Sequence, residues 1–240
     1  MVEVKRRFDE ELAFTHAANR CYEQHRATGR MRDGRRFGAP PHAYEPPLVP
    51  EGKINTTDPD SGVMIQQGQP PMQGYNAQAA VTTGQIIVTA EVTTTAPDYG
   101  QLEPTVRAAL RDLGAAGVTD TPTTVLADAG YWHKEQMERI ITDGMQVLIP
   151  PDSGLREGAR PGWEGGFYAF MRRVLTTDHG RAIYSKRKHI EPVFGQVKGN
   201  RRIDHFKRRG RAAVRSEWRL ITASHNLLKL HSHWTHPATG

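Results

Sequence analysis

The strongest constraint on the fold is the order of strand and helix patterns between residues 74 and 151. Two runs typical of strands, GYNAQAAV and IIVTAEVT, are separated by TTGQ, where Gly84 supplies a turn, so an antiparallel hairpin is predicted. The patterns that follow alternate between helix and buried strand: helix over 97–117, strand over 123–128, helix over 132–144, strand over 145–151. This order predicts an α/β domain in which the later strands are parallel.

The flanking segments differ from this regular part. Residues 1–54 are predicted to form a charged helix and a Pro/Gly-rich arm, and residues 151–180, which Gly and Pro interrupt, a helical insertion. Residues from about Ala182 to Phe206 are predicted as a basic helix, with a last helix from about Ala212 to Leu230. Residues 232–240 are taken as a tail. The last helix carries a stripe typical of core packing: Val214, Trp218, Ile221, His225 and Leu228.

The charge of the chain is strongly uneven. The net charge is +6, but residues 181–230 contain 14 Lys and Arg against 3 Asp and Glu, so the other 190 residues carry −5. Such a block predicts a polyanionic partner, most simply DNA or RNA. A single cysteine, Cys21, excludes a disulfide framework within one chain, and no apolar run has the length of a signal peptide core or a membrane span. The cytoplasm is the expected location.

Asp128 lies where an apolar strand ends and the small residues Ala129 and Gly130 begin. Functional groups of α/β sheets gather at the carboxyl ends of strands, so Asp128 is a candidate catalytic residue. Asp is also a good helix N-cap, and this second interpretation stays open. Asp98 is likewise expected to cap the helix that follows it.

A second candidate carboxylate, Glu191, lies inside the basic block. Helical periodicity places Tyr184, Arg187 and Lys198 on the same broad face as Glu191. A surface ion pair between Arg187 and Glu191 is the simpler explanation of part of this pattern. Pro192 favours a kink or a helix start directly after Glu191.

These four residues follow the pattern Y-x2-R-x3-E-x6-K, which resembles the signature of bacterial insertion-sequence transposases of the DDE type. Six further stretches resemble the same family in the same order: TTDPDSG, QGYNAQAAV, VLADAGYW, IEPVFGQVKGNRR, FKRRG and HNLLKL. The resemblance covers about Asn55 to Leu230. It is specific because independent motifs agree in their order and expected context.

The resemblance implies an RNase H-like domain over residues 55–231, with a mixed five-stranded sheet between helices. It implies that Asp128 and Glu191 bind two divalent ions, Mg²⁺ or Mn²⁺, and that the protein cleaves and joins DNA at transposon ends. The implied partners are double-stranded transposon-end and target DNA, bound by a homodimer. Basic and phenolic side chains would hold the phosphates: Tyr184, Arg187, Lys198, Arg201, Arg202, Lys207, Arg208 and Arg209.

The chain departs from the family at the first catalytic Asp, which the family carries on its first strand in a DGT-like context. The sequence contains no DGT, and its opening helix resembles the insertion after that strand, so the chain is interpreted as lacking the first strand, with an unpaired sheet edge. Asp58 and Asp60 are the candidate substitutes. Three functions stay open: a DNA strand-transferring enzyme, a transposase remnant that binds DNA without cutting it, and another nuclease of the same fold.

Overall fold

Two compact units make up the chain in the computed structural model, Met1–Pro59 and Asp60–Gly240. The structure describes residues 55–65, 68, 70–152, 158 and 165–235, together with scattered positions between 6 and 29. The Pro/Gly-rich arm and Cys21 lie outside these residues. No helix in the described ranges is both long enough and apolar enough to cross a membrane.

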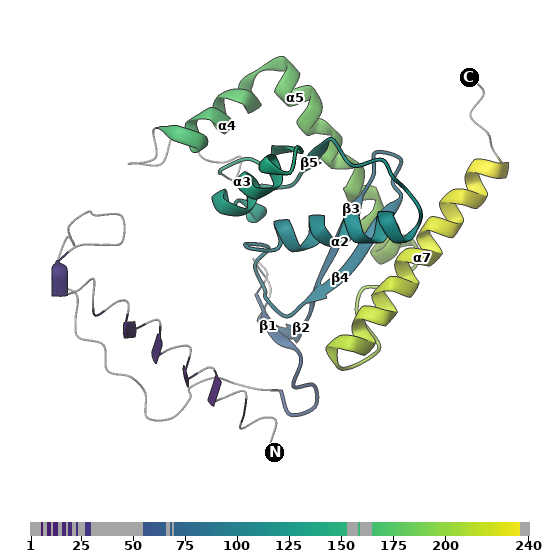
Figure 1. Ribbon diagram of the computed structural model, residues 1–240. Helices are drawn as coiled ribbons and strands as arrows, with labels where there is room; N and C mark the ends of the chain where they lie inside the picture. The colour runs from purple at the N-terminus through teal and green to yellow at the C-terminus, as the bar shows by residue number, and fades with distance from the viewer. Residues whose placement is uncertain are drawn as a thin grey trace. The chain divides into compact units, whose positions relative to one another are not determined.

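The predicted hairpin is present in the second unit (Figure 1). β3 (Asn76–Val81) pairs antiparallel with β4 (Ile87–Thr93). The register shifts between Ala80 and Val81, which marks a bulge. The extra residue lies in β4 and interrupts the alternation of its side chains between the two faces. Ile87, Ala90 and Val92 therefore belong to one apolar cluster, although positions 87 and 90 would otherwise face opposite sides.

Helices cover both faces of this hairpin. On the face that carries the buried cluster lies α7 (Arg211–Thr235), whose inner stripe packs against the strand. On the opposite face lies α2 (Leu102–Ala115), where the Thr89 hydroxyl donates a hydrogen bond to the Asp112 carboxylate. The inner stripe consists of four of the five residues predicted for it, Val214, Trp218, Ile221 and His225, whereas Leu228 is exposed.

The rest of the regular pattern follows the predicted order. β5 (Thr124–Leu126) leads into a 3-10 turn, η1 (Ala129–Tyr131), and then into α3 (Lys134–Thr142) and β6 (Gln146–Leu148). The predicted parallel pairing is confirmed between β5 and β6. These elements share a second apolar cluster with α4 (Gly166–Thr176), which lies in the segment predicted as a helical insertion.

The described strands do not join into the single five-stranded sheet that the resemblance implies. They form three two-stranded sheets: β3 with β4, β5 with β6, and a short hairpin of β1 (Gly62–Met64) with β2 (Met72–Gly74) that the sequence patterns did not predict. No strand among the described residues pairs with both β3 and β5. The molecule is therefore a mixed α/β structure that rests on helix packing more than on sheet continuity.

Side chains of α7 bind the backbone along the outer edge of β4. The Asn226 amide accepts from Ile87 N–H at 2.9 Å and donates to Ile87 C=O at 2.8 Å, as a neighbouring strand would. Farther along, the Nε groups of Arg219 and Arg211 donate to the carbonyls of Ala90 and Val92. We call this set of bonds the edge ladder. These bonds satisfy backbone N–H and C=O groups of β4 that would otherwise be open to pairing with another chain.

The edge ladder predicts a specific loss of stability. Asn226→Ala leaves the backbone N–H and C=O of buried Ile87 without their partners, and we expect the free energy of unfolding to fall by about 1–3 kcal/mol. Urea unfolding monitored by circular dichroism measures this change. The matched control is Asn200→Ala, an exposed position for which a change within about 0.5 kcal/mol is expected. Equal losses in both variants would refute the proposed contribution of the ladder.

Candidate functional site

The basic segment that carries Glu191 is not the continuous helix that its periodicity predicts. α5 (Asp178–Ser185) gives way to a 3-10 turn, η2 (Lys186–Ile190), then to one turn of α-helix, α6 (Glu191–Gly195), and to a π turn, η3 (Gln196–Asn200). Pro192 explains the break, because its ring fits the first turn of a helix but not the interior. Glu191 thus lies at the first position of a short helix.

Apolar side chains of α6 and η3 anchor this segment to the hairpin core. Val193 and Val197 are only 1% and 2% exposed and belong to the same cluster as Trp218 of α7. The ring of Phe194 stacks on Trp218 with centroids 5.9 Å apart. The opposite side of the segment, which includes Glu191 and Lys198, is exposed.

Of the four signature residues, Arg187 contacts both Tyr184 and Glu191. The Arg187 guanidinium lies 5.8 Å from the ring centroid of Tyr184, and its Nη2 donates to Oε1 of Glu191 at 3.1 Å. The expected surface ion pair is therefore present, with the Glu191 side chain 59% exposed. Lys198 is exposed on η3, and no hydrogen bond or ion pair joins it to the other three within the described part of the chain.

Asp128 begins the η1 turn. Its Oδ1 accepts a hydrogen bond from Gly130 N–H at 3.0 Å, so the capping interpretation is confirmed for this turn. α3 begins later, with His133 at its N-cap. The Asp128 side chain is exposed at the end of β5, where it was predicted as a candidate catalytic group.

The negative charge of Asp128 affects the pKa of Tyr184. Burial raises the pKa of the Tyr184 phenol, Arg187 opposes the rise, and the negative charge of Asp128 adds to it. Burial likewise raises the pKa of Tyr131, with the charges of Asp98 and Asp128 as further causes. Asp128 and Glu191 lie at the two ends of one series of interactions: the charge of Asp128 raises the pKa of Tyr184, Tyr184 contacts Arg187, and Arg187 pairs with Glu191.

A polar network behind Asp128 was missed by sequence reasoning. Asp98 does not cap α2; its Oδ1 accepts from Asn76 Nδ2 at 2.9 Å and from Gln78 Nε2 at 2.8 Å. The Tyr131 hydroxyl donates to Oε1 of Gln78, which is 3% exposed. The network therefore ties β3 to the turn that Asp128 caps. The signal in the sequence was the pair of amides at alternate positions of a strand otherwise composed of Ala and Val.

The two substitute candidates for a first carboxylate have different surroundings. Asp58 belongs to the first unit, where its N–H lies 3.4 Å from Oδ1 of Asn55. Asp60 belongs to the second unit and accepts from Arg211 N–H at 2.9 Å at the start of α7. It also lines a cavity of about 590 Å³ beside β4, α2 and α7, whose wall includes neither Asp128 nor Glu191.

The described residues contain no group of three or more His, Cys, Asp or Glu side chains that could hold a metal ion. Two carboxylates do fit the chemistry of Mg²⁺, which prefers oxygen ligands. Within the same described residues, Oδ2 of Asp128 and Oε2 of Glu191 make no hydrogen bond, so each offers an oxygen. Asp128 and Glu191 therefore stay the predicted ligands of a divalent ion.

The other predicted phosphate-binding residues lie in a loop between η3 and α7. Arg201 is held to α7, since its Nη1 donates to Ser224 Oγ at 2.8 Å. Glu217 fixes the loop backbone by accepting from the N–H groups of Lys207 and Arg208, both at 2.9 Å. The side chains of the remaining members are exposed: Arg202, Lys207, Arg208 and Arg209.

The packing around Asp128 predicts that Gly130 cannot be replaced without disturbing it. A Cβ at position 130 would lie 3.1 Å from Oδ1 of Asp128 and 3.5 Å from Oδ2 of Asp98, which is close for the first oxygen. We expect Gly130→Ala to lower the free energy of unfolding by about 1 kcal/mol.

The matched control for this substitution is Gly195→Ala. Gly195 is helical, and a Cβ there meets nothing within 4 Å. Alanine should therefore stabilise the protein by about 0.5–1 kcal/mol. Urea unfolding measures both variants, and a stabilised Gly130→Ala would show that the turn has room for a side chain.

Comparison with known protein families gives one finding. A family model described as Transposase DDE domain matches residues 59–227, which is well over half of the chain and includes Asp60, Asp128 and the four signature residues. Searches of curated proteins and of solved structures return no match. The match agrees with the resemblance of the sequence motifs, and the chain belongs to the DDE transposase domain family.

Proposed function

We propose that the chain is an insertion-sequence transposase that acts on DNA at transposon ends, with Asp128 and Glu191 as its catalytic carboxylates. The observation that carries the proposal is the grouping of Tyr184, Arg187 and Glu191, with the charge of Asp128 acting on Tyr184. A cap and a surface ion pair alone do not require these groups to be neighbours. The family match supports the same reading.

Each residue of the group suits a role on a DNA phosphate. The Tyr184 phenol is protonated at neutral pH, as an ordinary tyrosine is, and its raised pKa keeps it a donor, so it can give a hydrogen bond to a phosphate oxygen. Arg187 has the fork of donors that matches a phosphate, and its exposed ion pair with Glu191 is weak enough to exchange. A bound divalent ion would supply Lewis-acid stabilisation of the attacking and leaving oxygens.

A second candidate function is DNA binding without cleavage. It is favoured by the lack, among the described residues, of a group of three carboxylates or other metal ligands. The RNase H-like fold, Mg²⁺ or Mn²⁺ as cofactor, the bacterial insertion-sequence origin and the cytoplasmic location remain part of the proposal. They rest on the sequence motifs and on the family.

Binding to DNA should depend steeply on salt. The segment 181–219 has a net charge of +10, so we expect log affinity to fall with log salt concentration by about 0.9 per phosphate neutralised. Replacing both exposed residues Arg208 and Arg209 by Glu should weaken binding to every DNA sequence by roughly tenfold or more and flatten this slope.

Fluorescence anisotropy with labelled duplexes at several salt concentrations measures both effects. The control is a double variant with Lys134→Glu and Arg173→Glu, which reverses two exposed charges outside the basic block. Its affinity for DNA should stay near that of the unaltered protein. Affinity that does not change with salt would rule out binding through phosphates.

Cleavage should be weak in the 240-residue chain. Two ions must be held so that the attacking and leaving oxygens are in line, and small misplacement costs orders of magnitude in rate. With two carboxylates at the site, we expect the chain to bind DNA but to cut or join it slowly or not at all. The assay uses duplexes with matching transposon ends and Mg²⁺ or Mn²⁺, beside Glu191→Gln and Asp128→Asn.

Robust cleavage that Glu191→Gln abolishes would contradict this expectation and support the enzyme. Asp58→Asn and Asp60→Asn would then identify which residue supplies the third carboxylate. Cleavage that survives both Glu191→Gln and Asp128→Asn would overturn the assignment of the site itself.

A further inference from the structure

The cavity of about 590 Å³ lies beside β4, between α2 and the start of α7. Its wall takes side chains from all three elements, among them Glu91, Arg111, Arg211 and Arg215. This volume is in the range of sites that hold small molecules. Neither of the two candidate catalytic carboxylates lies in the wall, and all of the lining residues belong to the second unit. The cavity is therefore separate from the candidate site.

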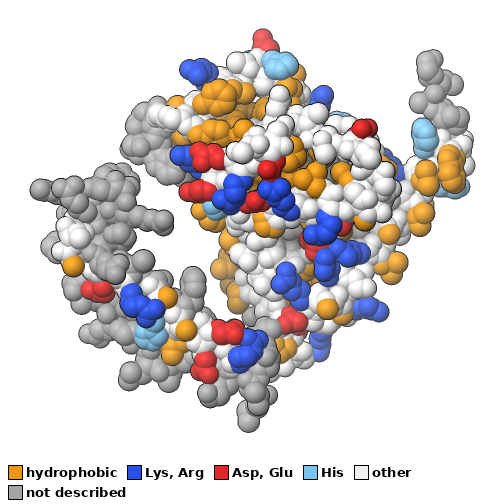
Figure 2. Space-filling view, in the orientation of Figure 1, with side chains coloured by type: hydrophobic (Ala, Val, Ile, Leu, Met, Phe, Trp, Pro, Cys, Tyr) orange, Lys and Arg blue, Asp and Glu red, His pale blue; other side chains and the backbone are white. Residues whose placement is uncertain are grey.

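Arginine side chains dominate the charge around the cavity. Arg215 and Arg219 of α7 bind the two carboxylate oxygens of Glu91, with nitrogen–oxygen distances of 2.6 and 2.7 Å. Arg111 of α2 approaches the same carboxylate only to 3.5 Å, which is long for a hydrogen bond. Figure 2 shows Lys and Arg side chains gathered on this face of the molecule, with a few Asp and Glu side chains among them.

Two guanidinium groups of the wall keep unused donors. Arg111 makes no hydrogen bond to any residue that the structure describes, and its second ion pair, to Asp112, is 3.7 Å long. Arg211 uses its Nε in the edge ladder, while its two terminal amino groups have no hydrogen bond within the same part of the chain. One arginine comes from α2 and the other from α7, so their donors line the cavity from two walls.

The carboxylates near the cavity would repel an anion, but each already has a positive or donating partner. Asp60 accepts from the backbone N–H of Arg211 at 2.9 Å, and Glu91 is held by the two ion pairs to α7. With Asp112 included, three carboxylates face four arginines, so the cluster keeps one positive charge. This surplus favours an anion over a cation.

We propose that the cavity binds a phosphate group, held between Arg111 and Arg211. A phosphate presents several oxygens, and the planar fork of a guanidinium can bind two of them at once. The phosphate can belong to a small phosphorylated molecule or to a nucleic-acid backbone, and the concave wall favours the small molecule. The proposal does not depend on the proposed function, because the cavity excludes both candidate catalytic carboxylates.

The first test measures the thermal midpoint of the protein with inorganic phosphate near neutral pH. For a dissociation constant of about 1–5 mM, phosphate at about 20 mM should raise the midpoint by about 2–6 °C. The reference is sodium chloride at equal ionic strength. Arg111→Gln removes the charge and the fork from an exposed side chain, so it should abolish most of this rise. Broadening of the phosphate ³¹P resonance by the protein measures the same binding directly.

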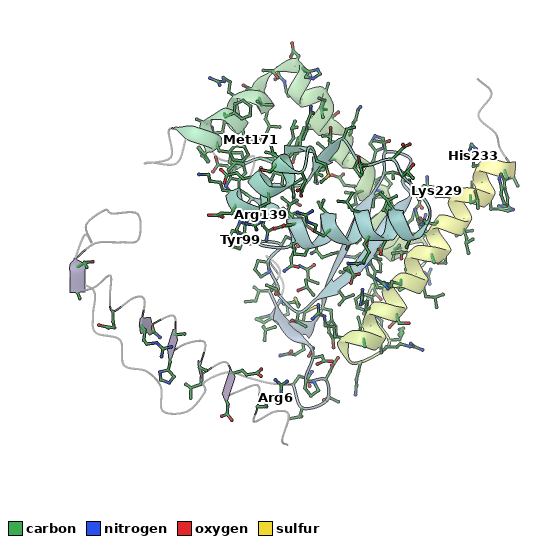
Figure 3. All side chains as sticks on the ribbon, viewed as in Figure 1. Arg6, Tyr99, Arg139, Met171, Lys229 and His233 are labelled. Atoms are coloured by element: carbon green, nitrogen blue, oxygen red, sulfur yellow. The ribbon has the colours of Figure 1, made fainter. Side chains whose placement is uncertain are left out.

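The matched control is Arg107→Gln. Arg107 lies one turn from Arg111 on α2 and is 48% exposed, but it pairs with Glu103 and Asp143 and lies outside the cavity wall. Glu103 also binds Arg139, which Figure 3 labels. The midpoint of Arg107→Gln should rise in phosphate as much as that of the unaltered protein.

A second variant, Thr105→Phe, tests the cavity without a change of charge. Thr105 lines the cavity from α2, and a phenyl ring at this position would fill part of the space. We expect this variant to lose the phosphate response and the ³¹P broadening. Its circular dichroism spectrum should match that of the unaltered protein.

A labelled DNA duplex distinguishes the two sources of the phosphate. If the site takes a small molecule, Arg111→Gln should change the affinity for the duplex by no more than about twofold. If Arg111→Gln weakens duplex binding by about fivefold or more, and inorganic phosphate competes with the duplex, the group is a backbone phosphate of DNA. Both results support a phosphate site in the cavity.

A midpoint that rises no more in phosphate than in chloride would overturn the proposal. An equal rise in the unaltered protein, Arg111→Gln and Thr105→Phe would overturn it as well, since phosphate would then act elsewhere on the protein. The phosphate measurements contain no DNA, so their failure would leave the proposed transposase function untouched. Failure of the cleavage and salt-dependence assays would likewise leave the phosphate site untouched.

Discussion

The edge ladder between α7 and β4 is the interaction on which the rest of the second unit depends. A two-stranded hairpin is marginal in water by itself, and the ladder gives it the neighbour that a third strand would otherwise provide. The bonds from Asn226 to Ile87 and from Arg211 to Val92 fix the helix along nearly the whole strand. α6 packs on the same core, so the position of Glu191 also depends on this alignment.

The candidate site combines groups that are already satisfied without DNA. Asp128 caps a turn and Arg187 pairs with Glu191, so neither carboxylate is left without a partner in the protein alone. Both interactions are exposed, and exposed ion pairs contribute only tenths of a kcal/mol to about 1 kcal/mol. Either interaction can therefore be broken at little cost in free energy. The partly buried network of Gln78, Asp98 and Tyr131 lies behind the turn.

Much of the local structure could be predicted from the sequence because it depends on near neighbours. The Gly84 turn predicted the hairpin, apolar periodicity predicted α2 and α3, and the apolar run before Asp128 predicted the strand β5. In the basic segment, residue spacing predicted one continuous helix, and this prediction was wrong. A period of 3.6 residues describes an α-helix and does not reveal where the backbone changes to 3-10 or π geometry. Contacts between residues that are far apart in the sequence could not be predicted either. Glu91 binds Arg215 and Arg219 more than a hundred residues away, and Asp98 binds amides of an earlier strand.

The uneven charge along α7 has a consequence for how the protein responds to ionic strength. Its first half carries Arg211, Arg215 and Arg219, and its second half only Lys229. Electrostatic attraction weakens as salt screens it, whereas contact between apolar surfaces persists and is strengthened by salts that are excluded from protein surfaces. A single helix thus contains two regions with opposite responses to the same solution change. Sulfate at high concentration would weaken the ion pairs of Arg215 and Arg219 with Glu91 while favouring contact between apolar surfaces at the other half.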